Sequence, residues 1–113
     1  MHIVTIKRLQ QASEESREAS SAIGSWIKIV KAARWRNFVE LRMSFPDADD
    51  VDGFVVFNIM HNRCRLITAV HYAKTIRGRL TPGHAYIGAF LNHKDYDRWS
   101  AMTGRRKAEW LQF

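Results

Sequence analysis

The chain has 113 residues, of which 46% are apolar, which is enough for one domain with a hydrophobic core. Its apolar runs are far shorter than the roughly 20 residues of a membrane span, and MHIVTIKR lacks the basic-then-apolar order of a secretory leader. The single cysteine, Cys64, excludes an intramolecular disulfide. We therefore expect one domain over residues 1–113 that is cytoplasmic and makes no membrane contact.

The net charge of +7 is concentrated in the second half of the chain. From Gly53 to Lys107, ten lysines and arginines outnumber two aspartates, Asp95 and Asp97. A basic half of this kind favours a polyanionic partner, and nucleic acid is the commonest one. The alternative is a basic protein without a nucleic-acid role.

The first part of the chain has mainly helical periodicity. A weak alternation from His2 to Ile6 predicts a short strand, and a largely polar helix is expected from Lys7. Ser20 or Ser21 is expected to cap the next helix. One face of that helix is apolar at helical spacing, with Ile23, Trp26, Ile27 and Val30.

A third, shorter helix is predicted to open at Trp35 and Asn37 and to end at Pro46. Its inward residues are expected to be Phe38, Leu41 and either Met43 or Phe45. The acidic stretch that follows, residues 47–53, is predicted to be a connector. The spacing of its four aspartates fits no calcium loop, so we expect no metal site there.

The rest of the chain alternates with period two and is rich in β-branched and aromatic residues. Residues 54–59 and 63–72 predict a hairpin with a short turn at 60–62. Residues 73–83 are either a long basic loop or a hairpin tip extended beyond the sheet. A further strand, 84–90, precedes a closing helix whose start is placed at 98–102. The order β-α-α-(α)-β-β-β-α predicts an α+β domain, with N-terminal helices packed on a mostly antiparallel sheet.

Titratable side chains gather directly after the last predicted strand, at His93, Lys94, Asp95, Tyr96 and Asp97. Proton-transfer groups at the end of a rigid element are suited to an active site. A histidine exchanges protons near neutral pH because its unperturbed pKa is about 6.5. If a helix begins at this point, the tyrosine lies one turn beyond the histidine.

Several motifs in this order resemble the HigB toxins of bacterial toxin–antitoxin pairs, within the RelE/ParE superfamily. The combination consists of F-N-I at 57–59, N-x-x-R-L at 62–66 and H-x-x-Y-D at 93–97. The similarity runs from residue 1 to about residue 99 and includes F-P-D-A-D at 45–49. It implies a small RelE-like fold.

The resemblance also implies an endoribonuclease, an mRNA interferase that needs no cofactor and usually cuts messenger RNA during translation on the ribosome. It further implies a HigA-like antitoxin with a helix-turn-helix domain, which silences the toxin. Operator DNA would be bound only through that antitoxin.

Metal-free cleavage of RNA uses the ribose 2′-OH as nucleophile and needs a base, an acid and a cation for the phosphate. We expect His93 to act as base or acid, Tyr96 to orient the 2′-OH or stack on a base, and Arg65 to bind the phosphate. Further RNA contacts are expected from Asn58, Asn62, Arg63, Lys94, Lys74, Arg77 and Arg79.

Each assignment has a structural alternative. His93 can cap the closing helix, Tyr96 can be a packing residue, and Arg65 can pair with Asp95 or Asp97. For the chain as a whole, the alternatives are a non-catalytic ParE-like inhibitor of DNA gyrase and an RNA-binding module without activity.

Overall fold

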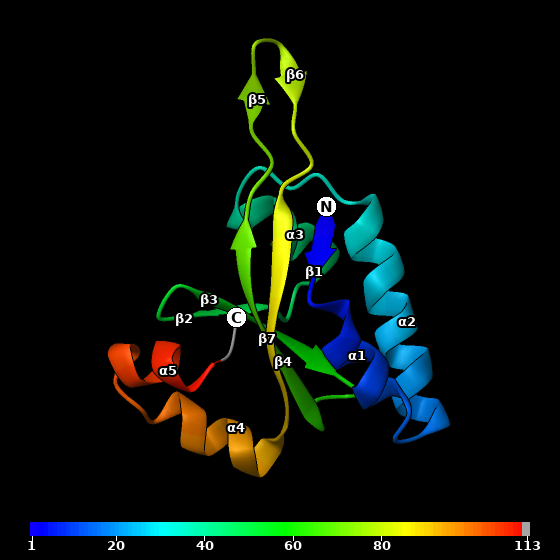
Figure 1. Ribbon diagram of the computed structural model, residues 1–113, viewed down its shortest axis with the longest axis vertical. Coiled ribbons are helices and arrows are strands. Elements are labelled where there is room, and N and C mark those ends of the chain that lie inside the picture. Colours follow the sequence, from blue (N-terminus) through cyan, green and yellow to red (C-terminus); the bar gives the residue numbers. More distant parts are fainter. Residues whose placement is uncertain (112–113) are drawn as a thin grey trace.

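A computed structural model describes residues 1–111 and has the α+β architecture predicted from the sequence (Figure 1). The helices are α1 (Ile6–Ser13), α2 (Arg17–Ala32), α3 (Phe38–Ser44), α4 (His93–Ser100) and α5 (Gly104–Trp110). The strands are β1 (His2–Val4), β2 (Asp49–Val51), β3 (Phe54–Ile59), β4 (Cys64–His71), β5 (Thr75–Ile76), β6 (Arg79–Leu80) and β7 (His84–Asn92). Among the described residues, no helix is long and apolar enough to cross a membrane.

The main sheet has the strand order β1-β7-β4-β3-β2. Its pairs are antiparallel except β1 with β7, which run parallel. β1 pairs only with residues 84–86 of β7, so the rest of that edge of β7 extends beyond β1. β7 therefore occupies the position between the N-terminal strand and the central hairpin.

One face of the sheet carries most of the core, and we call it the large-core face. Trp26 and Val30 of α2 and Leu9 of α1 pack there against Phe57 and Leu66. The rings of Trp26 and Phe57 meet edge to face, with centroids 5.3 Å apart. The amphipathic spacing of α2 thus places its apolar side on the sheet, as predicted.

The opposite face, which we call the small-core face, is covered at one end by α4 and α5. Val56 and Ile67 of the sheet pack there against Trp99 and Leu111. Lys107 of α5 is buried at the edge of this cluster. Its Nζ donates to Asp52 Oδ2 (2.7 Å) and to the Met102 carbonyl (2.6 Å), and the Trp99 indole donates to the Lys107 carbonyl. These contacts hold α5 against the β2–β3 turn.

A β-bulge in β7 determines which residues of this strand lie on each face of the sheet. Ile67 pairs with Ala89 and Thr68 with Ile87, which leaves Gly88 as the extra residue. One added residue reverses the side-chain alternation of a strand. Tyr86 and Ala89 consequently lie on the same, small-core face.

Several predicted boundaries in the first half were wrong. α2 begins before Ser20, because the Ser16 hydroxyl caps it by accepting from the Ala19 N–H at 3.0 Å. The acidic connector contains the edge strand β2, whose Asp49 pairs with Val56. Met43 of α3 is 80% exposed, and its inward alternative Phe45 is the one that packs against the core.

The closing helix also begins earlier than predicted, because Asn92 caps α4 and its side chain accepts from the Asp95 N–H at 2.8 Å. Residues 73–83 adopt the second of the two predicted conformations, a hairpin tip formed by β5 and β6. Arg77 and Gly78 form its turn with φ of 51° and 77°, the left-handed pair of a tight two-residue turn. The tip projects from one end of the long axis, and α4 lies at the other (Figure 1).

Candidate active site

The register of the sheet places two predicted site residues, Asn58 and Arg65, in one row with Leu91 on the small-core face. Asn58 of β3 is opposite Arg65 of β4, and Arg65 is opposite Leu91 of β7. Directly paired residues project on the same face of a sheet. α4 starts one residue after β7 ends, so its first turns pass beside this row.

Arg65 and Tyr96 form the central contact of the site. The guanidinium carbon lies 5.4 Å from the centre of the Tyr96 ring, which is a cation–π geometry. Arg65 Nη1 also donates to the Asn62 carbonyl at 2.6 Å. Within residues 1–111 no ion pair joins Arg65 to Asp95 or Asp97, so that alternative was wrong.

The turn that presents the Asn62 carbonyl is conformationally strained. Met60, His61 and Asn62 have φ of 57°, 54° and 70°, three left-handed residues in succession. Each such residue costs about 1–2 kcal/mol when it carries a Cβ. The turn thereby fixes the acceptor that orients Arg65, and strain of this kind is common beside functional sites.

Tyr96 keeps its hydroxyl proton over a wider pH range than an ordinary tyrosine. Partial burial raises its pKa most, and the carboxylates of Asp49 and Asp97 add to this effect. Arg65 acts in the opposite direction but does not cancel the rise. The hydroxyl is therefore protonated near neutral pH and can donate a hydrogen bond.

His93 is the first residue of α4 and pairs with Asp97 one turn later. The distance from His93 Nδ1 to Asp97 Oδ2 is 3.1 Å, and the two side chains are 62% and 64% exposed. An ionised carboxylate only accepts hydrogen bonds, so Nδ1 carries the proton and Nε2 is left as the basic nitrogen. The capping role goes to Asn92, so the alternative role of His93 as the helix cap was wrong.

Asn58 anchors the acidic segment next to the site, since its side-chain amide donates to the Asp47 carbonyl at 3.4 Å. That segment includes Asp49, whose charge raises the pKa of Tyr96 and which was not predicted to be a site residue. The partnership of Asp97 with His93 was also missed. Helical i, i+4 spacing would have indicated Asp97, whereas the position of Asp49 depends on β2, which lacks a strand-like apolar pattern.

The other predicted RNA contacts lie apart from this row. Arg63 forms an ion pair with Glu18 of α2. Lys94 is exposed on α4. The remaining three belong to the tip formed by β5 and β6, which Figure 1 shows at the far end of the molecule from α4, namely Lys74, Arg77 and Arg79.

Cys64 is unsuited to nucleophilic catalysis. Burial is the main factor that raises the pKa of its thiol, with a smaller contribution from Glu15. A cysteine acts as a nucleophile through its thiolate, which a raised pKa makes scarce near neutral pH.

Comparison with known proteins identifies the class to which this fold and site belong. The family model HigB_toxin, described as the RelE-like toxic component of a toxin–antitoxin system, matches residues 19–99. The match covers most of the chain and includes Asn58, Arg65, His93 and Tyr96. The chain belongs to this toxin family, which confirms the resemblance found in its motifs.

Individual relatives agree with the family match. The mRNA interferase toxin HigB of Escherichia coli K12 is 24% identical over 105 residues, which is 90% of this chain and 93% of the relative. The mRNA interferase HigB proteins of Escherichia coli O157:H7 and Shigella flexneri match with the same identity and coverage.

Proposed function

We propose that this protein is an mRNA interferase, an endoribonuclease toxin that cleaves messenger RNA without a metal ion. The observation that carries the proposal is the cation–π contact of the Arg65 guanidinium with Tyr96, which lies about one helical turn after His93 and directly before Asp97, the partner of His93. This arrangement supplies the cation, proton donor and base that transfer through the ribose 2′-OH requires.

In the proposed reaction, His93 Nε2 removes the proton from the 2′-OH, and the oxygen attacks the adjacent phosphorus. The new P–O2′ bond forms as the P–O5′ bond breaks. The Tyr96 hydroxyl gives its proton to the departing 5′-oxygen, which yields a 2′,3′-cyclic phosphate and a free 5′-OH. Arg65 stabilises the negative charge that accumulates on the phosphate, because its planar fork fits the two non-bridging oxygens.

Induced expression with mapping of transcript 5′ ends tests this function. Wild type should produce discrete new 5′ ends and arrest growth, and Arg65→Ala and His93→Ala should do neither. Arg36→Ala is the matched control, since it removes an arginine that pairs with Glu40 on α3 and should leave cleavage intact. Intact transcripts accompanied by DNA damage would instead indicate a gyrase inhibitor.

We further propose that cleavage takes place on translating ribosomes and that a HigA-like helix-turn-helix antitoxin blocks it and carries the pair to operator DNA. The strongly basic second half of the chain supports a partner rich in RNA. A transcript with its start codon removed should escape cleavage if translation is required. Co-expression with the product of an adjacent helix-turn-helix gene should give a stable complex and restore growth.

A further inference from the structure

A group of aromatic rings lies on the small-core face, at the end that α4 and α5 do not cover. His2 of β1 pairs with His84 of β7, which pairs with His71 of β4, so three histidines form a row across three strands. Tyr86 lies beside them, with its ring centre 5.0 Å from that of His71 and 6.0 Å from that of His84. All three histidines are exposed, so their rings are accessible.

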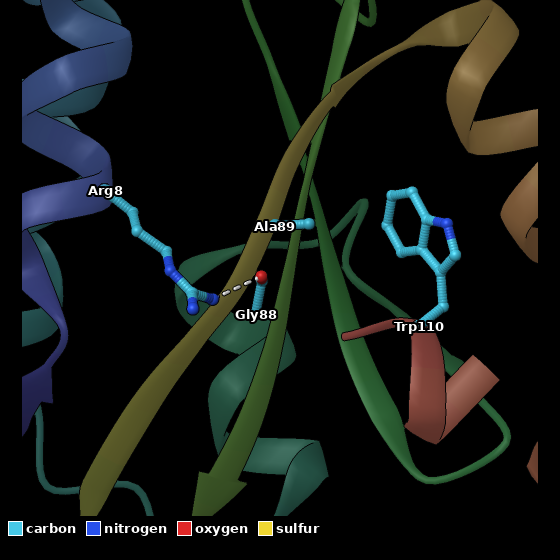
Figure 2. Close-up of a pocket in the computed structure, with 4 residues that line it drawn as sticks. All are labelled: Arg8, Gly88, Ala89 and Trp110. Atoms are coloured by element: carbon cyan, nitrogen blue, oxygen red, sulfur yellow. Dashed lines mark hydrogen bonds between the residues drawn. The ribbon is translucent and has the colours of Figure 1, made fainter. Parts of the chain in front are cut away.

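A pocket of about 510 Å³ lies further along β7. Gly88 and Ala89 line it together with Arg8 of α1 and Trp110 of α5, and Figure 2 shows the arginine and the indole on opposite sides of the strand. Arg8 Nη1 donates to the Gly88 carbonyl at 2.7 Å and to the Ile87 carbonyl at 3.2 Å. Trp110 is 44% exposed, so the pocket offers a cation and a ring to a ligand.

The tip formed by β5 and β6 continues this surface beyond the histidine row, because it connects His71 to His84. It carries Lys74, Arg77 and Arg79, and none of them forms an ion pair with another described residue. Residues 53–94 contain no aspartate or glutamate at all. The rings of the histidine row and Tyr86 therefore lie between Arg8 at the pocket and the cations of the tip, and residues 53–94, which include β7 and the tip, carry no negative charge.

We propose that this surface is a second binding site, which holds single-stranded RNA flanking the phosphate that is cleaved. We call it the β7 track and define it as the pocket residues Arg8 and Trp110, the rings of Tyr86, His84, His71 and His2, and the cations of the tip. Unpaired bases stack on exposed rings, and arginines and lysines bind the phosphates between them, which is the usual chemistry of single-strand recognition. The inference rests on the proposed function, which supplies RNA as the ligand.

The distance along β7 indicates how the two sites cooperate. His84 lies seven residues before Leu91 of the active-site row, which is roughly 23 Å at about 3.3 Å per residue. One nucleotide cannot span that length, so the track contacts nucleotides several positions from the cleaved bond. Long RNA should therefore bind more tightly than a short RNA that fills the active site alone.

The experiment measures fluorescence anisotropy with two RNAs, of about 4 and about 12 nucleotides, each with a 2′-deoxy sugar at the cleavage position. Wild type should bind the longer RNA more tightly. Trp110→Ala and His84→Ala should each weaken the longer complex about tenfold and leave the shorter one unchanged, because base stacking contributes about 1–3 kcal/mol. For the longer RNA, the double variant Arg77→Gln/Arg79→Gln should make the slope of log K against log salt concentration shallower by about 1.4. This value corresponds to two lost phosphate contacts at about 0.7 each.

Val39→Ala is the matched control, because Val39 is 73% exposed on α3, away from the track. The substituted track residues are exposed, and circular dichroism with thermal melting verifies their folding. Equal binding of the longer RNA by wild type, Trp110→Ala and His84→Ala would overturn the track while cleavage by wild type still supported the proposed function. Equal losses of affinity for the short and the long RNA in Trp110→Ala and His84→Ala would also overturn the track. Failure of wild type to bind either RNA, together with failure to cleave transcripts that keep the 2′-OH, would remove both proposals.

Discussion

The guanidinium carbon of Arg65 lies 5.4 Å from the centre of the Tyr96 ring, and this contact joins β4 to α4 across the small-core face. Tyr96 is thereby held between a cation and two nearby carboxylates, Asp49 and Asp97, with opposite effects on its pKa. Burial raises the pKa of the hydroxyl most, and these three charges adjust that rise in opposite directions.

This balance predicts opposite shifts of the Tyr96 pKa in two variants. Asp49→Asn should lower it towards the ordinary value of about 10, and Arg65→Ala should raise it further. Phenolate absorbance against pH, with the Tyr96→Phe curve subtracted, isolates the residue. Because the folded state favours the neutral phenol, its contribution to stability is complete below about pH 10 and is lost as the pH rises through the raised pKa. A pKa unchanged in both variants would contradict the charge assignment.

The histidine pair predicts a graded loss of cleavage. His93→Ala should lower the rate by about 10²–10⁴-fold, the usual contribution of a positioned base. Asp97→Asn should lower the rate by less, because the imidazole of His93 is still present. Some loss is expected because an amide can donate to Nδ1, which moves the proton to Nε2 and removes the base. Single-turnover cleavage of a fixed transcript measures both. Full activity in His93→Ala would show that another group takes the proton from the 2′-OH.

The two asparagine caps provide a matched pair for separating stability from activity. Asn92 caps α4 and Asn37 caps α3, each through its side-chain oxygen. Replacing either by Ala should lower the free energy of unfolding by about 1 kcal/mol. Only Asn92→Ala should also slow cleavage, because α4 carries His93 and Tyr96. Urea denaturation and cleavage assays on the same samples test this, and equal slowing in both variants would contradict it.

Lys107 predicts a stability effect that does not involve the site directly. Its side chain is 5% exposed and donates to Asp52 Oδ2 and to the Met102 carbonyl. Lys107→Ala should lower the free energy of unfolding by about 1.5–3 kcal/mol, since bonds to charged groups contribute that much. Lys31→Ala, an exposed lysine of α2, should change it little. Comparable urea midpoints for the two variants would show that the buried contacts are not stabilising.

Much of this fold could be predicted because its signals are local. Alternation gave β3, β4 and most of β7, and the helical spacing of Trp26 and Val30 gave the buried side of α2. β2 could not be found in this way, because its aspartates carry no strand pattern and its existence depends on pairing with β3. The early start of α2 was missed because Ser16, Ser20 and Ser21 are all plausible caps in sequence.

The site was only partly predictable for a related reason. The hairpin register alone places Asn58 opposite Arg65, and both had been identified as site residues. The ring contact between Arg65 and Tyr96 depends on how α4 leaves β7, which no pattern in the sequence specifies. The predicted cations fall into separate regions for the same reason, with Arg63 paired to Glu18 on the large-core side.

The parallel pairing of β1 with β7 has a consequence for synthesis of the chain. Strand β1 is synthesised first, yet it pairs with residues 84–86, and His93 and Tyr96 of the candidate site come later still. Contacts so distant in sequence form late, after most of the chain is available. During translation of this protein, the proposed active site is therefore still incomplete, and the folded domain forms only when synthesis of the chain is nearly finished.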